Sequence, residues 1–157
     1  MPKICDNKSV GMLVFKDDKL LLIERKRFPF GFAPPAGHVD ENGDDFEAAA
    51  RRELSEEVGL EAKDIRLLIE GRKDTACRRE GGSWHYWKIY KIDTDGDIKR
   101  SEEETKQARF YSNDEIISLS SRTEEYIQGK ISQEEWEKCP GIELVWYEWF
   151  KELNLIP

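Results

Sequence analysis

Apolar residues near the N-terminus form two short runs with a charged segment between them. Residues 10–15 (VGMLVF) and 20–23 (LLLI) are almost wholly apolar, and residues 16–19 (KDDK) are all charged. Short apolar runs on either side of a polar turn are typical of strands that are buried on both faces. The pattern therefore predicts a hairpin of two largely buried strands.

The segment after this hairpin is rich in proline, glycine and phenylalanine. Residues 28–45 are FPFGFAPPAGHVDENGDD, and so many glycine and proline positions disfavour a regular element. We therefore predict a long loop here. Long loops in compact domains are often functional.

A helix is predicted immediately after this loop. Good helix formers, chiefly alanine, arginine, glutamate and leucine, predominate over residues 46–58. Gly59 stands where helices commonly end in the left-handed conformation. Asp44 or Asp45 can cap the N-terminus, and Glu47 follows Asp44 at the spacing of a capping box. We expect Asp44 to be the N-cap.

The rest of the chain mixes strands with helices. Strands are predicted over residues 65–69, 83–92 and 108–111. Helices are predicted after a cap at Asn113 or Asp114, after the capping box that begins at Ser132, and over the aromatic-rich residues 142–155 that follow a Cys-Pro-Gly break. This mixture predicts the α/β or α+β class, as a single domain over residues 1–157 with a helical C-terminal extension over about 121–157.

Composition and charge limit the kinds of partner. The chain has 157 residues, with 25 lysines and arginines against 33 aspartates and glutamates, so its net charge is −8. A negative protein repels the nucleic-acid backbone, so we expect no stable nucleic-acid binding. The longest apolar run, residues 10–15, is far shorter than the ~18 residues of a membrane span. The first ten residues also lack the apolar core of a signal peptide, so we expect neither membrane insertion nor secretion.

The cysteine pattern bears on location and on metal binding. Cys5, Cys77 and Cys139 are odd in number and widely spaced, so they predict neither a disulfide framework nor a cysteine-based zinc site. His38 and His85 have no partner at a metal-ligand spacing either. A reducing, cytoplasmic location is therefore expected.

Three carboxylates of the predicted helix share one face. Glu53, Glu56 and Glu57 stand at positions i, i+3 and i+4, which lie within an arc of about 100°. Like charges at this spacing destabilise a helix, and a divalent cation such as Mg²⁺ would offset that repulsion. Arg52 lies one turn before Glu56 and can orient it. The alternative is an ordinary solvated helix face.

The segment from residue 37 to residue 60, GHVDENGDDFEAAARRELSEEVGL, resembles the Nudix box, G-x5-E-x7-R-E-U-x-E-E-x-G-U with U aliphatic. Eight of the nine fixed positions match: Gly37, Arg52, Glu53, Leu54, Glu56, Glu57, Gly59 and Leu60. One extra residue follows Gly37, and Asp44 stands where the family has its first glutamate. We call residues 37–60 the box segment.

The resemblance implies a fold, a chemistry and a set of residues. The fold would be an α/β/α sandwich with a mixed sheet and a loop–helix–loop box. The activity would be hydrolysis of a nucleoside diphosphate linked to another group, with Mg²⁺ or Mn²⁺ as cofactor. Glu53 and Arg52 would be catalytic, while Gly37, Asp44 and Gly59 would support the box. The metal ligands would be Glu53, Glu56, Glu57 and Glu104, with Glu102 and Glu103 as alternatives to Glu104.

Basic residues outside the box are candidates for binding phosphate. The resemblance implies such a role for Arg25 and Lys26, which end the second predicted strand. The alternative is that both are surface charges. Arg78 and Arg79 lie near the aromatic strand, and for them we expect a solvated position.

Aromatic residues are candidates for stacking on a nucleobase. Trp84 and Tyr86 share one face of the predicted strand, and His85 and Trp87 share the other. Phe30 lies in the long loop. We predict that Trp84, Tyr86 and Phe30 contact the substrate, whereas core packing is the commoner fate of strand aromatics.

The substrate stays open at this level. A (d)NTP or a modified purine nucleotide is the first hypothesis, and hydrolysis of ADP-ribose, a dinucleoside polyphosphate or a nucleotide sugar is an alternative. Thr75 occupies the position where ADP-ribose enzymes of the family often have proline. A non-catalytic nucleotide-binding or sensing module is the second class of function. We expect a monomer or a homodimer.

Overall fold

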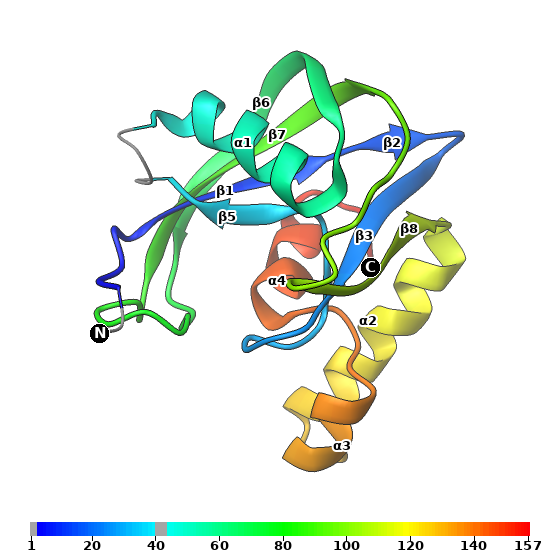
Figure 1. Ribbon diagram of the computed structural model, residues 1–157. Coiled ribbons are helices and arrows are strands. Elements are labelled where there is room, and N and C mark those ends of the chain that lie inside the picture. The colour runs from blue at the N-terminus through cyan, green and yellow to red at the C-terminus, as the bar shows by residue number, and fades with distance from the viewer. Residues whose placement is uncertain (1–2, 40–43) are drawn as a thin grey trace.

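The computed structural model describes residues 3–39 and 44–157 (Figure 1). The strands are β1 (Lys8–Leu13), β2 (Phe15–Lys16), β3 (Lys19–Arg25), β4 (Phe32–Ala33), β5 (Ala36–His38), β6 (Glu61–Lys73), β7 (His85–Asp95) and β8 (Thr105–Tyr111). The helices are α1 (Phe46–Val58), α2 (Asn113–Ile127), α3 (Gln133–Lys138) and α4 (Leu144–Glu152).

The strands form two sheets. The first has the order β5-β1-β7-β6, in which β1 and β7 are parallel and the outer strands run antiparallel to their neighbours. The second has the order β2-β3-β4, and β8 also pairs with β3. Figure 1 shows α1 on one side of the first sheet and α4 on the other. The mixed sheet and its covering helices confirm the predicted α+β class.

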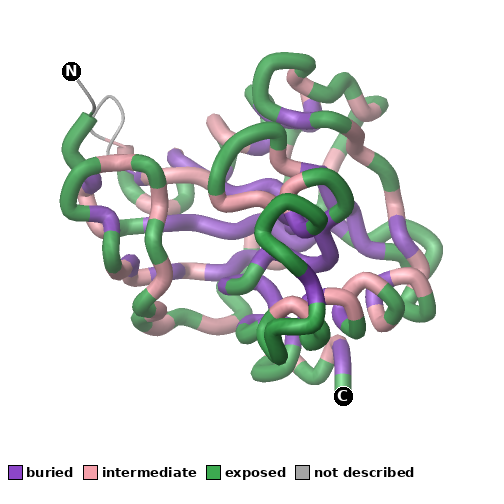
Figure 2. Tube along the Cα trace, turned by 90° about the horizontal axis from the view of Figure 1, so that it is seen from below, coloured by how far each residue is buried: buried purple, intermediate pink, exposed green. Residues whose placement is uncertain are grey.

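The core has two layers, one on each side of β1. Val10 and Met12 are fully buried in the layer that contains Leu54 of α1. Gly11, between them, faces α4, and a Cβ at this position would lie 2.3 Å from the indole of Trp146. Figure 2 shows this burial along the central strands, with exposed residues in the connecting loops. A strand covered on both faces explains why its sequence is continuously apolar.

The predicted hairpin is only partly correct. β3 pairs with the two-residue strand β2, with Phe15 opposite Leu20. β1 instead pairs with β5 and β7 in the other sheet, so the prediction of one strand over residues 10–15 was wrong. The chain leaves one sheet for the other at Val14, whose carbonyl accepts a hydrogen bond from the Leu21 N–H at 2.9 Å. Apolarity alone does not show whether β1 pairs with β3 or with β5 and β7, because either pairing buries the same side chains.

The predicted long loop contains two short strands, so the exclusion of regular elements was also wrong there. β4 pairs with β3, and β5 pairs with β1. Pro34 and Pro35 lie between these strands and lack the N–H groups that a continuous ladder needs. Residues 40–43 of the predicted loop lie outside the described residues.

Helix α1 has the predicted bounds but not the predicted cap. The Asp45 carboxylate accepts a hydrogen bond from the Ala48 N–H at 2.8 Å, so Asp45 is the N-cap and the prediction for Asp44 was wrong. Gly59 ends the helix as predicted, with a φ of 70° in the left-handed region. Aspartate caps a helix well at either position. Asp45 is the cap here because the Asp44 carboxylate accepts a hydrogen bond from Arg52 instead.

Replacement of Asp45 by alanine should lower the free energy of unfolding by ~0.5–2 kcal/mol, because the Ala48 N–H loses its acceptor. Asp45→Asn should be nearly neutral, since asparagine caps about as well as aspartate. Chemical denaturation without divalent metal measures both values. Equal losses in the two variants would contradict the cap.

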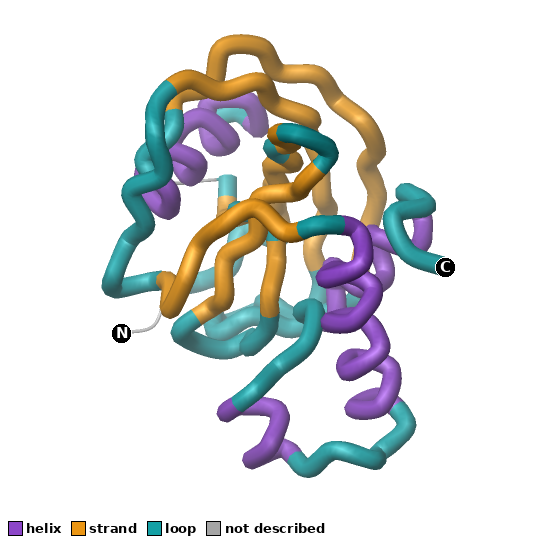
Figure 3. The backbone as a smooth tube through the Cα atoms, turned by 90° about the vertical axis from the view of Figure 1, so that its right-hand side faces the viewer, coloured by secondary structure: helices purple, strands orange, loops and turns teal. Residues whose placement is uncertain are grey.

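The C-terminal elements follow the predicted order with shifted bounds. Ser112 caps α2 through a full capping box with Glu115, one residue before the nearer of the two predicted caps. Ser132 caps α3 as predicted. The last helix is shorter than predicted, because α4 spans Leu144–Glu152. Figures 1 and 3 show α2 and α3 extending beyond the sheets. No helix in the described part of the chain is long and apolar enough to cross a membrane.

Candidate active site

A cavity of about 220 Å³ opens beside α1, and it brings together carboxylates from distant parts of the chain. Glu53, Glu56 and Glu57 line it from α1, and Glu104 lines it from the segment before β8. Glu57 is buried, whereas the Glu56 side chain is about half exposed at 51%. Glu102 and Glu103 do not line this cavity. The structure thus favours Glu104 among the three alternatives.

A close approach of β5 to α1 holds the Glu53 carboxylate at the cavity. A Cβ on Gly37 would lie 2.2 Å from Cδ of Glu53 and 2.5 Å from its Oε1. Only a residue without a side chain leaves room for the carboxylate in this position. The glycine that the sequence placed at the start of the box segment is therefore explained by contact with Glu53.

Arg52 connects the helix to the residues before it. Its Nε donates to Oδ2 of Asp44 at 2.7 Å, and its Nη1 donates to Oε1 of Glu53 at the same distance. Its Nη2 donates to the His38 carbonyl at 3.2 Å. The predicted pair with Glu56 is the longer one, at 3.7 Å. Arg52 therefore orients Glu53 more than Glu56, and Asp44 supports the box segment through this arginine.

Burial and mutual repulsion raise the pKa of two of these carboxylates, Glu53 and Glu57. Burial raises the pKa of Glu53 to about 7, with Arg52 opposing the shift. Burial and then the charge of Glu53 raise the pKa of Glu57 well above its usual value. Within residues 3–39 and 44–157, Oε2 of Glu57 is buried without a hydrogen-bond partner, while its Oε1 accepts from the Ala36 N–H at 3.4 Å. An unsatisfied carboxylate oxygen among other carboxylates fits a hard divalent cation.

Positive charge lies at the same cavity. Arg25 lines it and pairs with the buried Glu143, at 3.5 Å from Nε to Oε1. Burial raises the pKa of Glu143 to about 7, and Arg25 opposes that shift. Arg78 and Arg79 also line the cavity, where Arg78 is exposed as expected and Arg79 is partly buried. The loop that carries them folds back over the site, which spacing along the sequence does not reveal.

Lys26 does not line this cavity. Its ammonium donates to the Glu102 carbonyl at 2.5 Å. The predicted role of Lys26 on substrate phosphate is therefore not supported by its position. Arg27 does line the cavity and is the basic residue that sequence reasoning passed over.

The aromatic predictions identified the wrong face of β7. Trp87 lines the cavity, whereas Trp84 and Tyr86 do not, because alternate residues of a strand point to opposite faces. Phe30 lies at a different cavity beside α3, and Phe28 is the loop aromatic at the carboxylate site. Alternation alone could separate the two faces of the strand. It could not tell which face meets the cavity, because that depends on how segments distant in sequence pack together.

A carboxylate-lined cavity with arginines around it, on an α+β fold, is the arrangement of a protein that handles phosphate through a divalent metal. The NUDIX domain model matches residues 6–134 of the chain. The chain belongs to the Nudix hydrolase family, which acts on pyrophosphate bonds.

Individual relatives agree with this assignment. The chain is 34% identical over 123 residues to a protein named ADP-ribose pyrophosphatase from Methanocaldococcus jannaschii, covering 76% of this chain and 70% of the relative. A NUDIX hydrolase structure from Nitrosomonas europaea has a TM-score of 0.60 and 25% identity, over 79% of this chain and 90% of the other. A MutT NUDIX hydrolase structure from Burkholderia pseudomallei has a TM-score of 0.61 and 24% identity, over 69% and 84%. The latter likeness concerns the fold alone.

Proposed function

We propose that this protein is a divalent-metal-dependent pyrophosphohydrolase that cleaves a nucleoside diphosphate linked to a second group. The observation that carries the proposal is the meeting of the three α1 carboxylates and Glu104 at one cavity that arginines also line. Water would attack one phosphorus of the pyrophosphate and break its bond to the bridging oxygen. The products would be a nucleotide and a phosphorylated remainder.

Glu53, Glu56, Glu57 and Glu104 would hold Mg²⁺ or Mn²⁺, which when bound lowers the pKa of water and neutralises charge on the phosphates. Glu53 would also accept the proton of the attacking water. Arg52 fixes the carboxylate for this role through its hydrogen bond to Oε1.

The remaining residues of the cavity would bind the substrate. Arg25, Arg27, Arg78 and Arg79 bring positive charge to a chain whose net charge is −8, and guanidinium groups match phosphate oxygens in two-pronged hydrogen bonds. The ring of Trp87 offers an apolar surface at the same cavity. A compound in which two phosphates join two other groups would contact both the arginines and the Trp87 ring.

ADP-ribose is the first substrate that we propose. The support is the Methanocaldococcus jannaschii relative, which carries the name ADP-ribose pyrophosphatase and matches 76% of this chain. A (d)NTP or a modified purine nucleotide is the second candidate, because the box segment does not distinguish these substrates from ADP-ribose.

A hydrolysis panel with identified products tests the proposal. ADP-ribose, dNTPs, Ap4A and nucleotide sugars would each be incubated with the protein and Mg²⁺ or Mn²⁺. We expect AMP and ribose 5-phosphate from ADP-ribose at a higher kcat/KM than release of a nucleoside monophosphate from any dNTP. The reverse order would support the second candidate. Binding of these nucleotides with no turnover of any of them would reject the enzyme and favour a sensing module.

Millimolar Mg²⁺ should raise the melting temperature of the protein, because a ligand that binds only the folded state stabilises it. The cation would relieve repulsion among the carboxylates of α1. Differential scanning fluorimetry at constant ionic strength measures the shift, with Na⁺ as the control salt. The shift should shrink in Glu57→Gln, and an equal response to Na⁺ and Mg²⁺ would contradict specific binding.

A further inference from the structure

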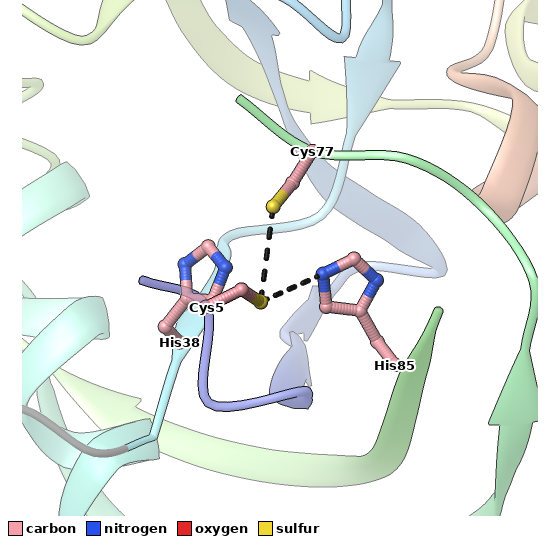
Figure 4. A group of neighbouring side chains, drawn as sticks. All are labelled: Cys5, His38, Cys77 and His85. Carbon is pink, nitrogen blue, oxygen red and sulfur yellow. Dashed lines mark hydrogen bonds between the residues drawn. The ribbon is translucent and has the colours of Figure 1, made fainter. Parts of the chain in front are cut away.

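Four side chains that are distant in sequence converge beside the active site. Cys5 comes from the N-terminal segment, His38 from the end of β5, Cys77 from the loop between β6 and β7, and His85 from the start of β7. One ligand atom from each lies within 4.8 Å of all the others (Figure 4). The chain has only two histidines and three cysteines, and the structure gathers all of them here except Cys139.

The distances fit a tetrahedral metal site. A Zn–S bond of about 2.3 Å and a Zn–N bond of about 2.0–2.1 Å, at tetrahedral angles, place two sulfurs ~3.8 Å apart and a sulfur and a nitrogen ~3.6 Å apart. The Cys77 and Cys5 sulfurs are 3.8 Å apart, and the Cys5 sulfur lies 3.3 Å from Nε2 of His85. A disulfide would require ~2.05 Å between the sulfurs, so the two cysteines are free in this structure.

A backbone N–H donates to the sulfur of each cysteine, although burial raises the pKa of the Cys5 thiol to about 11 while no metal is bound. The N–H two residues after each cysteine donates to its sulfur, from Asn7 to Cys5 at 3.3 Å and from Arg79 to Cys77 at 3.4 Å. Such hydrogen bonds stabilise the negative charge that a metal-bound sulfur carries. A Cβ on Gly82 would lie 2.2 Å from the Cys77 sulfur, so glycine lets the loop close around it.

The histidine rings are withdrawn from solvent. Burial lowers the pKa of His38 to about 4 and also lowers the pKa of His85. Nε2 of His38 is buried without a hydrogen-bond partner among the described residues. A buried nitrogen without a partner costs stability, and a metal ion at the centre of the cluster would remove that cost.

We propose that Cys5, His38, Cys77 and His85 bind one structural Zn²⁺ ion. Two thiolates and two imidazoles form the closed tetrahedral set that structural zinc prefers, and no position is left for a catalytic water. Each thiol loses its proton to solvent when the ion binds. The ligands of this ion differ from the carboxylate cluster, although His38, Cys77 and His85 line the same cavity, and hard cations such as Mg²⁺ select the carboxylate oxygens instead.

The ion would reinforce segments that hydrogen bonds already join, such as the one from the Cys5 N–H to the Glu80 carbonyl at 2.7 Å. It would tie the N-terminal segment and the loop between β6 and β7 to the sheet that carries the box segment. That loop also brings Arg78 and Arg79 to the active-site cavity. The zinc would therefore fix the wall of the substrate cavity opposite α1.

Elemental analysis of the untagged full chain tests the proposal directly. After dialysis against metal-free buffer, we expect about one zinc ion per chain.

Replacement by Co²⁺ should give the visible absorption of a tetrahedral ion and a sulfur-to-cobalt charge-transfer band. In the folded holoprotein only Cys139 should react rapidly with a thiol reagent, and all three cysteines should react once a strong chelator has removed the ion. Protein without bound metal and with three reactive thiols, or with a disulfide between Cys5 and Cys77, would overturn the site.

Variants separate this site from the hydrolase proposal. Replacing a residue that only hydrogen-bonds a metal ligand costs ~10–100-fold in metal affinity. Cys77→Ser removes a ligand itself, so it should weaken zinc binding by at least ~100-fold. Loss of the ion should also lower the melting temperature. Cys139→Ser is the matched control, because its side chain is exposed and outside the cluster, and it should keep the zinc. Glu53→Gln should also keep the zinc while losing turnover. Zinc lost equally from both cysteine variants, or a Co²⁺ spectrum unchanged in Cys77→Ser, would contradict the ligand assignment.

Discussion

Replacement of Glu53 by glutamine is expected to lower kcat by at least ~10²-fold, because the variant loses a metal ligand and a group that accepts the proton of the attacking water. The fold should survive. Glutamine has nearly the same shape, and its amide oxygen can still accept the hydrogen bond that Nη1 of Arg52 gives to Glu53. Burial raises the pKa of Glu53, so an uncharged group at this position should not lower the stability of the metal-free protein.

Glu47→Gln is the matched control for this substitution. Glu47 lies on the same helix, is exposed, and does not line the cavity, so its amide should leave kcat near the wild-type value. Steady-state kinetics on the best substrate and melting curves with and without Mg²⁺ would be recorded for both variants. Glu53→Gln with wild-type kcat would show that the family residues do not carry their roles to this helix.

The sequence was sufficient to predict the parts of the site that lie close together along the chain. Glu53, Glu56 and Glu57 share a face because helix geometry fixes their relative directions, and α1 has the predicted bounds. The cap was off by one residue, since Asp44 and Asp45 cap equally well. The ion pair between Asp44 and Arg52 decides between them, and it depends on the path of the chain before the helix.

Features that depend on distant segments could not be predicted in this way. The cluster that we propose to bind zinc brings Cys5 to Cys77 and His38 to His85, and none of these pairs has a spacing that signals a metal site. Their meeting follows from β1 lying between β5 and β7, with β7 parallel to it. A parallel neighbour is not specified by apolar runs, so the spacing of cysteines and histidines along the chain could not reveal that these four side chains converge.

Gly37→Ala is the second substitution with a large expected effect on turnover. The φ of Gly37 lies outside the left-handed region, so the backbone accepts alanine without strain. The new Cβ would nevertheless lie 2.2 Å from Cδ of Glu53. The flexible end of the glutamate has to move, which costs little stability but displaces the carboxylate by ~1 Å, and a displacement of that size can reduce catalysis by ~10²-fold.

Gly71→Ala distinguishes this displacement from a general effect of replacing glycine in a strand. Gly71 lies in β6 with φ outside the left-handed region, and its added Cβ would lie 3.7 Å from the Trp149 indole, an ordinary contact. Such a replacement should be neutral or stabilise the protein by up to ~1 kcal/mol, because it restricts the unfolded chain. We therefore expect Gly71→Ala to keep the wild-type kcat and Gly37→Ala to lose it at a similar melting temperature. Wild-type turnover in Gly37→Ala would mean that the Glu53 carboxylate acts from a position away from β5. The close packing of β5 against α1 would then have no part in the chemistry.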